Sequence, residues 1–353
     1  MQMIRLLIGL IISLLFTVSC KEEIVFKGSE LTPRLVVNCL ISPDSIIVAQ
    51  VKQSNPIQKP TYGNNTVANA VVRLYENSKF IGFLTLNTEE IEIGNTAYSI
   101  GEVYSLSGLN LKEGNLYRLE VEASGFEPVS AEVTIPHPVQ ISTVDTSYIT
   151  IRDVRNDDAR VISFHVKFSD PTSERNYYRL VVRETNGFTG SWGYGGHEGT
   201  FYRVRIDHAI SLLGSNDVAI NPQGSNYEDS FLSPAYNRFF VFSDDLFNGT
   251  DATVSVYIKR YTHPWIDIKE FNLYEIELHS ISKEYYLYEK SFRQFDHKYD
   301  DPFAEPVQVF SNIENGYGIF AAYSIDKFIV LEGVYPDYSD EYTVEYYTLS
   351  NSD

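Results

Sequence analysis

Hydrophobic and polar residues alternate along most of the chain with the period of two that is typical of β-strands. In residues 116–122, Tyr117, Leu119 and Val121 alternate with charged side chains. Segments of this kind, separated by turn residues, are predicted as strands: 35–41, 46–53, 70–75, 80–86, 116–122, 129–135, 161–168, 177–183, 201–206, 239–243, 253–261, 273–279, 307–310 and 318–323. So many short strands predict a mainly β fold, with two β-sandwich units of the immunoglobulin-like kind.

One segment has the period of a helix instead. Its apolar residues are spaced four, three, four and three apart, which places them on one helical face: Ile281, Tyr285, Tyr288, Phe292 and Phe295. Ser282 is placed to cap the first turn. Glu289 and Arg293 are expected to pair on the solvent side. The sequence therefore predicts an amphipathic helix near 282–296 that packs its aromatic stripe on a sheet of the second unit.

The division between the two units is expected at Pro136-His137-Pro138. Two prolines stiffen the backbone and cannot donate to a sheet ladder. This gives an N-terminal β-sandwich domain over 35–136 and a C-terminal β-rich domain over 137–353. The chain has 353 residues, which suits about two domains at roughly 150 residues each.

The first residues are typical of an export signal. An apolar run of thirteen residues, 6–18, follows Arg5, whereas a membrane-spanning helix needs about 20. The run ends in Thr17-Val18-Ser19-Cys20, which resembles a bacterial lipobox with Thr17 where Leu is usual. Residues 1–19 are therefore expected to be a lipoprotein signal peptide, with lipid on Cys20 and a tether over 20–34. The alternative is an ordinary secretory signal with an incidental cysteine.

Three charged residues, Lys21, Glu22 and Glu23, follow the expected lipidation site. They resemble the surface-export tag of Bacteroidota lipoproteins, an address that sorting machinery reads. The expected location is the outer membrane, with the protein anchored by lipid and facing the cell surface. The alternative is that these residues are only a solvated tether, which leaves periplasmic display open.

Composition narrows the classes of partner. The formal net charge is −19, and so acidic a surface repels phosphate backbones, which argues against nucleic-acid binding. Apart from Cys20, only Cys39 is present, in an apolar predicted strand, so a buried core thiol is expected and no internal disulfide.

Exposed aromatic side chains are the candidates for ligand binding. Phe188, Trp192, Tyr194 and His197 lie in a glycine-rich segment, 187–199, that is predicted as a loop. Mobile backbone carrying aromatic rings suits stacking on glycans or peptides. Trp265, in a His-Pro-Trp turn, is a second candidate. The alternatives are an insertion that covers a sheet edge and a packed turn.

A calcium site is the one metal site that the sequence suggests. Asp244, Asp245, Asn248 and Asp251 carry hard oxygen ligands close together between two predicted strands. The spacing differs from the EF-hand pattern, and the same residue types also serve ordinary turns. No other cofactor is expected. The chain has no His-Glu-x-x-His helix, no Gly-x-Ser-x-Gly elbow and no phosphate-binding Gly-x-x-x-x-Gly-Lys loop.

Four blocks resemble a family of Bacteroidota outer-membrane lipoproteins built on a domain of unknown function: 35–37, 125–136, 242–249 and 305–320. The last, which ends in Gly316-Tyr317-Gly318-Ile319-Phe320, is the most specific. The resemblance implies a two-part β protein on a lipid anchor, often encoded near TonB-dependent receptors, and it supplies no catalytic residues.

These observations favour a non-enzymatic, lipid-anchored protein that is accessory to a TonB-dependent receptor or binds a glycan or peptide. Two alternatives stay open. One is an envelope scaffold or assembly factor, and the other is a hydrolase whose site is assembled across strands.

Overall fold

The computed structural model describes residues 32–43, 45–55, 65–87, 91–93, 96–98, 102–152, 158–172, 174–194, 197–207, 213–221, 240–258, 271–298, 307–332 and 344–348. Arg34–Ser54 and Asn64–Asp353 form one compact unit. The expected signal peptide, Cys20, the export tag Lys21–Glu23 and Trp265 lie outside the described residues.

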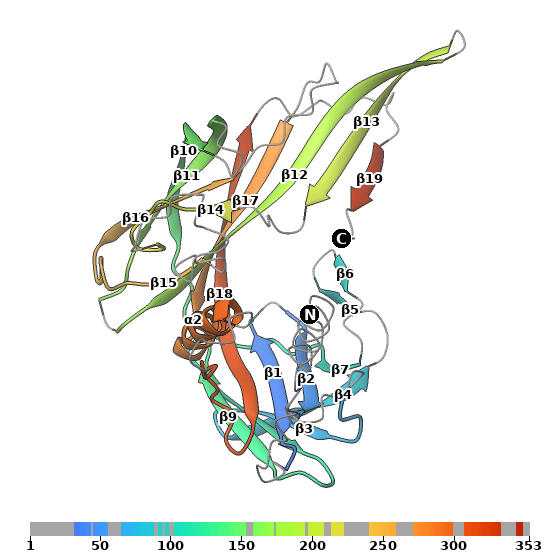
Figure 1. Cartoon of the computed structure of the whole chain (residues 1–353), viewed down its shortest axis with the longest axis vertical. Helices are drawn as coiled ribbons and strands as arrows, with labels where there is room; N and C mark the ends of the chain where they lie inside the picture. Colours follow the sequence, from blue (N-terminus) through green and yellow to red (C-terminus); the bar gives the residue numbers. More distant parts are fainter. Residues whose placement is uncertain are drawn as a thin grey trace, which may run out of the picture. The chain divides into compact units, whose positions relative to one another are not determined.

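The prediction of a mainly β fold with one helix packed near a sheet is confirmed (Figure 1). The N-terminal strands are β1 Leu35–Ile41, β2 Ile47–Gln53, β3 Val71–Glu76, β4 Lys79–Asn87, β5 Ile91–Ile93, β6 Thr96–Tyr98, β7 Val103–Leu106, β8 Leu116–Glu122 and β9 Val129–Thr134. The later elements are β10 Ile141–Arg152, β11 Asp158–Ser169, β12 Tyr177–Tyr194, β13 His197–Asp207, β14 Leu213–Gly214, β15 Val241–Ser243, β16 Asp251–Ile258, β17 Phe271–Ile281, α2 Lys283–Lys298, β18 Tyr317–Glu332 and β19 Val344–Thr348.

Most strands belong to a single large mixed sheet, in the order β19-β13-β12-β17-β18-β1-β2-β7-β4-β3-β8-β9, with β15 paired to β12. A second sheet has the order β10-β11-β16-β14, and β5 pairs with β6.

The first hydrophobic core lies where the large sheet folds over on itself. The first part of β4 pairs with β3 and its last residues pair with β7, so β4 belongs to both layers. Val37 and Cys39 of β1 face Leu74 and Leu119 in one buried cluster, as the alternating pattern of these strands requires. Burial raises the pKa of the Cys39 thiol to about 12. Cys39 is therefore the buried core residue that the sequence predicts.

The second core lies between the two sheets. Alternate residues of β11 and β16 pack against alternate residues of β12 and β17, including Phe164 on Tyr274 with ring centroids 5.0 Å apart. The division at Pro136–Pro138 stays a prediction. The two cores use residues on either side of it, but the first also takes Ile313, Phe320 and Ala322 from the C-terminal part.

Strand β18 joins the two halves of the large sheet. Its first residues, from Tyr317 to Ala322, pair in parallel with β1. From Tyr323 to Glu332 it pairs antiparallel with β17. One continuous strand is therefore shared by both sandwiches. Figure 1 shows β18 running from the side of β1 to the side of β17.

The segment just before β18 closes the first sandwich. The Asn312 side chain mimics a strand, because its Nδ2 donates to the Phe320 carbonyl at 2.8 Å and its Oδ1 accepts from the Phe320 N–H at 3.0 Å. The Glu314 N–H donates to the Ser130 carbonyl of β9 at 2.8 Å. Asn315, with φ of 62°, takes the left-handed conformation that Asn tolerates, just before Gly316. These contacts give the family-like block at 305–320 a structural role.

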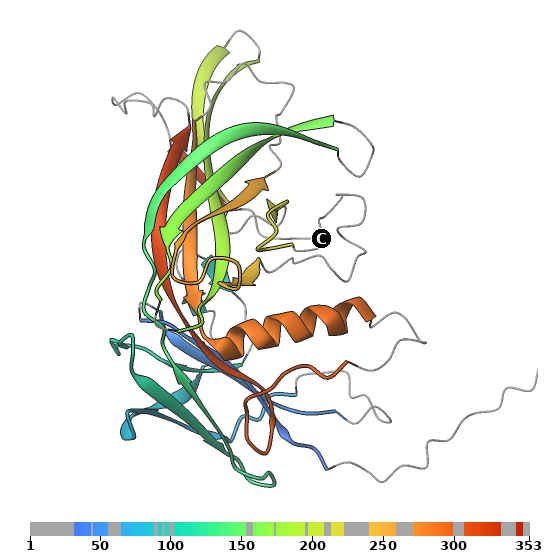
Figure 2. The ribbon, with the colours of Figure 1, turned by 90° about the vertical axis from the view of Figure 1, so that its left-hand side faces the viewer.

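The helix is confirmed, with one change to its stripe. The Ser282 hydroxyl accepts from the Tyr285 N–H at 3.3 Å, as expected of an N-cap. Ile281 and Tyr285 are buried against Val241, Ile319 and Ala321. Tyr288 is partly buried against the same cluster, whereas Phe295, at the far end of the stripe, is exposed. Figure 2 shows α2 beside β18. It is not a helix that could span a membrane.

Several strand predictions differ from the structure, and β5, β6, β7, β14 and β19 match no predicted segment. Residues 307–310 form no strand; the Phe310 N–H donates to Ser291 Oγ of the helix at 2.8 Å, so a side chain takes the place of a ladder partner. Strand β10 was not predicted. Its first residues are fixed by side chains, with the Ile141 N–H donating to Asp326 Oδ2 at 2.7 Å.

Replacing Gly318 by Ala should destabilise the protein by about 3 kcal/mol or more. Gly318 has φ of +102°, and an added Cβ would lie 2.1 Å from the Val37 carbonyl oxygen of β1. The backbone pairing of β1 with β18 leaves no room for it. The midpoint of urea denaturation, followed by circular dichroism, measures the loss.

Gly125→Ala is the matched control for this steric effect. Gly125 has φ of +87° and nothing within 4 Å of an added Cβ, so it carries only the conformational cost of about 1 kcal/mol. Equal shifts of the two variants would contradict a steric requirement at the β1–β18 pair.

Candidate functional site

A cavity of about 280 Å³ lies between α2, β15 with the turn after it, and the short turn at 218–220. Its floor is formed by two apolar side chains, Ile220 and Phe242, each of which is only 2% exposed. Its mouth carries Val218 and Leu246, which are 61% and 65% exposed. The lining therefore combines buried apolar side chains with exposed ones.

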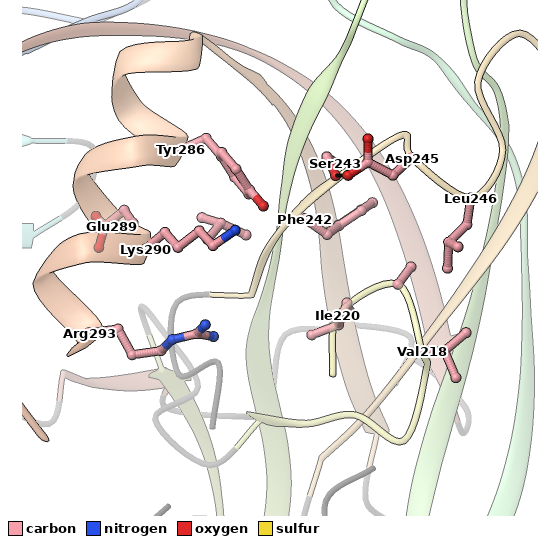
Figure 3. A pocket seen from close by; sticks show the side chains of 12 residues that line it. Val218, Ile220, Phe242, Ser243, Asp245, Leu246, Tyr286, Glu289, Lys290 and Arg293 are labelled. Atoms are coloured by element: carbon pink, nitrogen blue, oxygen red, sulfur yellow. Dashed lines mark hydrogen bonds between the residues drawn. The ribbon is translucent and has the colours of Figure 1, made fainter. Parts of the chain in front are cut away.

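The helix supplies the polar wall of this cavity. Tyr286, Lys290 and Arg293 are spaced four and three residues apart, so they share a face of α2. Figure 3 shows the Tyr286 hydroxyl and the nitrogens of Lys290 and Arg293 lying toward the strands. In the same view the carboxylate of Glu289 lies on the other side of the helix ribbon.

Arg293 does not lie on the solvent side of the helix, as the sequence pattern predicted. It is partly buried, and burial lowers the pKa of its guanidinium. Its Nε is buried and makes no hydrogen bond within the part of the chain that the structure describes. The i, i+4 spacing takes account only of residues within the helix. It therefore could not predict that the β15 segment covers this face of α2, which becomes a cavity wall.

A row of stacked groups fixes the position of the wall. The rings of Tyr177 and Tyr286 stack with centroids 4.7 Å apart. The Arg175 guanidinium lies 5.7 Å from the Tyr177 ring, and Lys290 Nζ lies 5.5 Å from the Tyr286 ring. Each cation is attracted to the face of a ring. The row ties the start of β12 to α2 and holds Lys290 beside the cavity.

The acidic group opposite this wall is already paired. Asp245 accepts hydrogen bonds from the Ser243 hydroxyl at 2.8 Å and from the Arg175 guanidinium. These two bonds and the charge of Arg175 lower the pKa of the Asp245 carboxyl. Asp245 therefore stays ionised and is paired with Arg175, whereas Arg293 has no such carboxylate partner among the described residues.

Backbone strain occurs next to the cavity. Phe240 has φ of +53°, a left-handed conformation that is rare for a bulky residue. It is buried in the second core, and its carbonyl accepts from the Leu180 N–H at 3.2 Å. After it, Val241 faces the helix cluster while Phe242 faces the second core, as neighbouring residues of a strand do. Strained residues of this kind often accompany functional sites.

The residues predicted for calcium are placed for other contacts. Asp244 is buried and its Oδ2 accepts from the Asn176 N–H at 2.7 Å; Asp251 accepts from the Ser169 hydroxyl. The Phe247 and Thr250 N–H groups close successive turns around Asn248, which is exposed. Within the described residues, no three His, Cys, Asp or Glu side chains are grouped to hold a metal ion. The geometry matches the turn alternative, and calcium stays an untested prediction.

The glycine-rich segment is a hairpin and not the predicted loop. Phe188, Trp192 and Tyr194 belong to β12, at positions that fall on one face of a strand. His197, which begins β13, pairs with Tyr194 at the tip. The glycines did not prevent a strand, because pairing with β13 and, at Gly187, with β17 satisfies the backbone.

Of the cavity residues, only Asp245 was named as a site residue from the sequence, as a calcium ligand. Lys290 and Arg293 follow the helical period, but nothing local shows what covers that face. Ile220 and Phe242 read as ordinary apolar positions. The usable signal was the family-like block 242–249, which contains Phe242, Ser243 and Asp245.

A buried charged network lies on the helix-bearing face of the large sheet. Glu277 is 1% exposed; it accepts hydrogen bonds from Arg183 Nε and His279 Nε2, both at 2.8 Å, and Lys327 Nζ lies 3.3 Å away. Burial raises the pKa of Glu277, but these bonds outweigh burial and the net pKa is well below its ordinary value. Burial lowers the pKa of His279, only partly offset by Glu277. His279 is therefore neutral and donates a hydrogen bond to Glu277, and the positive charges of Arg183 and Lys327 offset the negative charge of Glu277.

A family profile described as "Domain of unknown function (DUF4249)" matches residues 21–329. Because the match covers most of the chain, the chain belongs to this family. No curated protein matches the chain.

Acid should destabilise the protein in two steps. The unfolded chain protonates His279 below pH ~6.5 and Glu277 below pH ~4.5, whereas both pKa values are lower in the folded state. The free energy of unfolding should therefore fall as the pH drops from 7 to 5, by up to about 1.4 kcal/mol per pH unit for the one proton on His279.

Urea denaturation of wild type and of His279→Gln over this pH range tests the first step. Gln keeps a donor for Glu277 but does not titrate, so the variant should lose most of the slope. His137→Gln, at an exposed histidine outside the network, is the control. An unchanged slope in His279→Gln would show that His279 does not carry the effect.

Proposed function

We propose that this member of the family is a lipid-anchored protein of the bacterial outer membrane that faces the cell surface, binds a ligand without transforming it, and is accessory to a TonB-dependent receptor. The observation that carries the proposal is the cavity beside α2. It combines an apolar floor, a stacked aromatic row and two cations, as binding sites for small molecules do.

Sequence features support the anchor. The thirteen-residue apolar run ends at Cys20, and Lys21-Glu22-Glu23 follows directly. A lipid on Cys20 would hold the acidic body at a membrane without a basic patch. The family match begins at residue 21, immediately after this cysteine.

The lining of the cavity supports binding over catalysis. Among the described residues, those that line it include neither a histidine nor a cysteine. The Ser243 hydroxyl donates to Asp245, and Asp245 is engaged by Arg175. A nucleophilic serine needs a free general base within reach, so this pair serves structure. The resemblance to receptor-associated lipoproteins supports the accessory role.

Changing Cys20 to Ser should release the protein from the membrane. Without the thiol no lipid can be attached, and the remaining chain should appear in the soluble fraction after cell lysis. Radioactive palmitate should label wild type only. Membrane retention of the unlabelled variant would contradict the lipid anchor. Protease treatment of intact cells tests the surface: Lys21→Ala/Glu22→Ala/Glu23→Ala should become protected, whereas wild type should be cut.

Purification of the full chain from native membranes tests the receptor role. Mild detergent extraction through a C-terminal tag, with identification by mass spectrometry, should recover a TonB-dependent receptor in near-equal amount. The soluble Cys20→Ser variant is the control for non-specific capture. Recovery of a lone monomer in every detergent tried would count against the accessory role.

A further inference from the structure

We propose that the cavity beside α2 binds an amphipathic organic anion, in which a carboxylate is attached directly to a compact apolar group. This inference rests on the proposed binding function and names the chemical class of the ligand for that site.

The anionic end is assigned by the two cations of the helix. Lys290 and Arg293 reach the cavity from successive turns of α2, and Figure 3 shows their nitrogens on the same side. Arg293 Nε is buried with no hydrogen-bond partner among the described residues. A buried guanidinium donor without an acceptor is unfavourable, and a carboxylate is the acceptor that matches its fork. The Tyr286 hydroxyl lies next to them as a third donor.

The apolar end is assigned by the opposite wall. Ile220 and Phe242 form a buried floor, and Val218 and Leu246 extend it to the mouth. Burial of an apolar group there removes hydrocarbon from water on both sides of the contact. The polar and apolar walls face one another, so the ligand must carry both characters within a short distance.

The size of the cavity sets the size of the ligand. A volume of about 280 Å³ holds about nine waters at roughly 30 Å³ each. A ligand of about ten non-hydrogen atoms fills that space, as a short aryl or alkyl carboxylic acid does. Longer ligands must extend through the mouth between Val218 and Leu246.

Electrostatics make this cavity an exception on the protein. The whole chain carries −19, which repels anions at long range. At the cavity, Asp245 is held by Arg175, and the Glu289 carboxylate lies on the other side of the helix, whereas the nitrogens of Lys290 and Arg293 lie toward the strands. An anion therefore binds here through local contacts and not through the overall field.

Calorimetric titration of the full chain in lipid nanodiscs, with empty nanodiscs subtracted, tests the assignment. The probe is 3-phenylpropionate, with about eleven non-hydrogen atoms, and we expect one site per chain with a dissociation constant on the order of a millimolar or tighter. The amide 3-phenylpropanamide and the cation 3-phenylpropylamine should each bind at least about tenfold more weakly.

Variants locate the site. Lys290→Gln and Arg293→Gln should each weaken the carboxylate by about three- to tenfold. Lys283→Gln, the same change at an exposed position of the first turn of α2 and outside the cavity, should leave it unchanged. Val218→Asp places a carboxylate at the exposed mouth; it should weaken the acid and spare the amine, with the thermal midpoint of the free protein showing that the fold is intact.

Two sources of such a group are separated by a second pair of probes. A free acid is represented by 3-phenylpropionate, and a peptide C-terminus by N-acetyl-Ala-Phe with a free or an amidated end. Tighter binding of the free-ended peptide than of the small acid would assign a peptide C-terminus. The reverse order would assign a free organic acid.

Equal affinity for acid, amide and amine would overturn the inference, as would full binding by Arg293→Gln or no binding of any probe. If a receptor still co-purifies in those cases, only the ligand class has failed. If the carboxylate binds but neither the lipid label nor the receptor is found, the proposed function has failed and the ligand class stands.

Discussion

The shared strand β18 is the constraint on which the rest of the structure depends. Its first residues add to the sheet of the first sandwich by parallel pairing with β1, and the remainder pairs antiparallel with β17 in the second. Phe320 and Ala322 enter the first core, Ile319 and Ala321 pack under the helix, and Phe328 and Val330 reach the second core. One strand therefore contributes to three apolar clusters, so that damage to its pairing affects all of them.

The cavity follows from this arrangement. Helix α2 begins directly after β17, and Ser282 Oγ accepts both the Tyr285 N–H of the first turn and the Ala322 N–H of β18. These two hydrogen bonds to one oxygen fix the point at which the helix leaves the sheet. Strand β15 then packs Val241 beneath the first turn while Phe242 turns into the second core. The gap left between the helix and this short strand is what Lys290, Arg293 and Phe242 line.

Local sequence patterns predicted the helix and most strands, but they did not predict which distant strands pair. The period of the helix and its Ser282 cap depend on neighbours in sequence, and both were found. The parallel pairing of β1 with β18 joins residues from opposite ends of the chain, and no local signal specifies it. The glycine-rich segment was misread for the same reason, because a partner strand satisfied a backbone that composition alone assigns to a loop. The helical period placed Arg293 on the solvent side. It could not show that a strand from another part of the sequence covers this face of the helix.

Two buried or partly buried charged groups in this molecule differ in whether they have a partner, and the difference indicates which one supports the fold and which one a ligand. Glu277 lies deep in the large sheet, and its charge is met by Arg183 and Lys327 and by a hydrogen bond from His279. Breaking such a buried set leaves a bare charge, so it fixes one packing of the sheet. Arg293 is the contrasting case: it is partly buried, and its Nε has no acceptor among the described residues. A paired buried charge stabilises the fold that contains it, whereas a buried donor without an acceptor is costly unless something else completes it. Arg293 therefore leaves a buried guanidinium donor without an acceptor among the described residues, beside a cavity lined by Ile220 and Phe242.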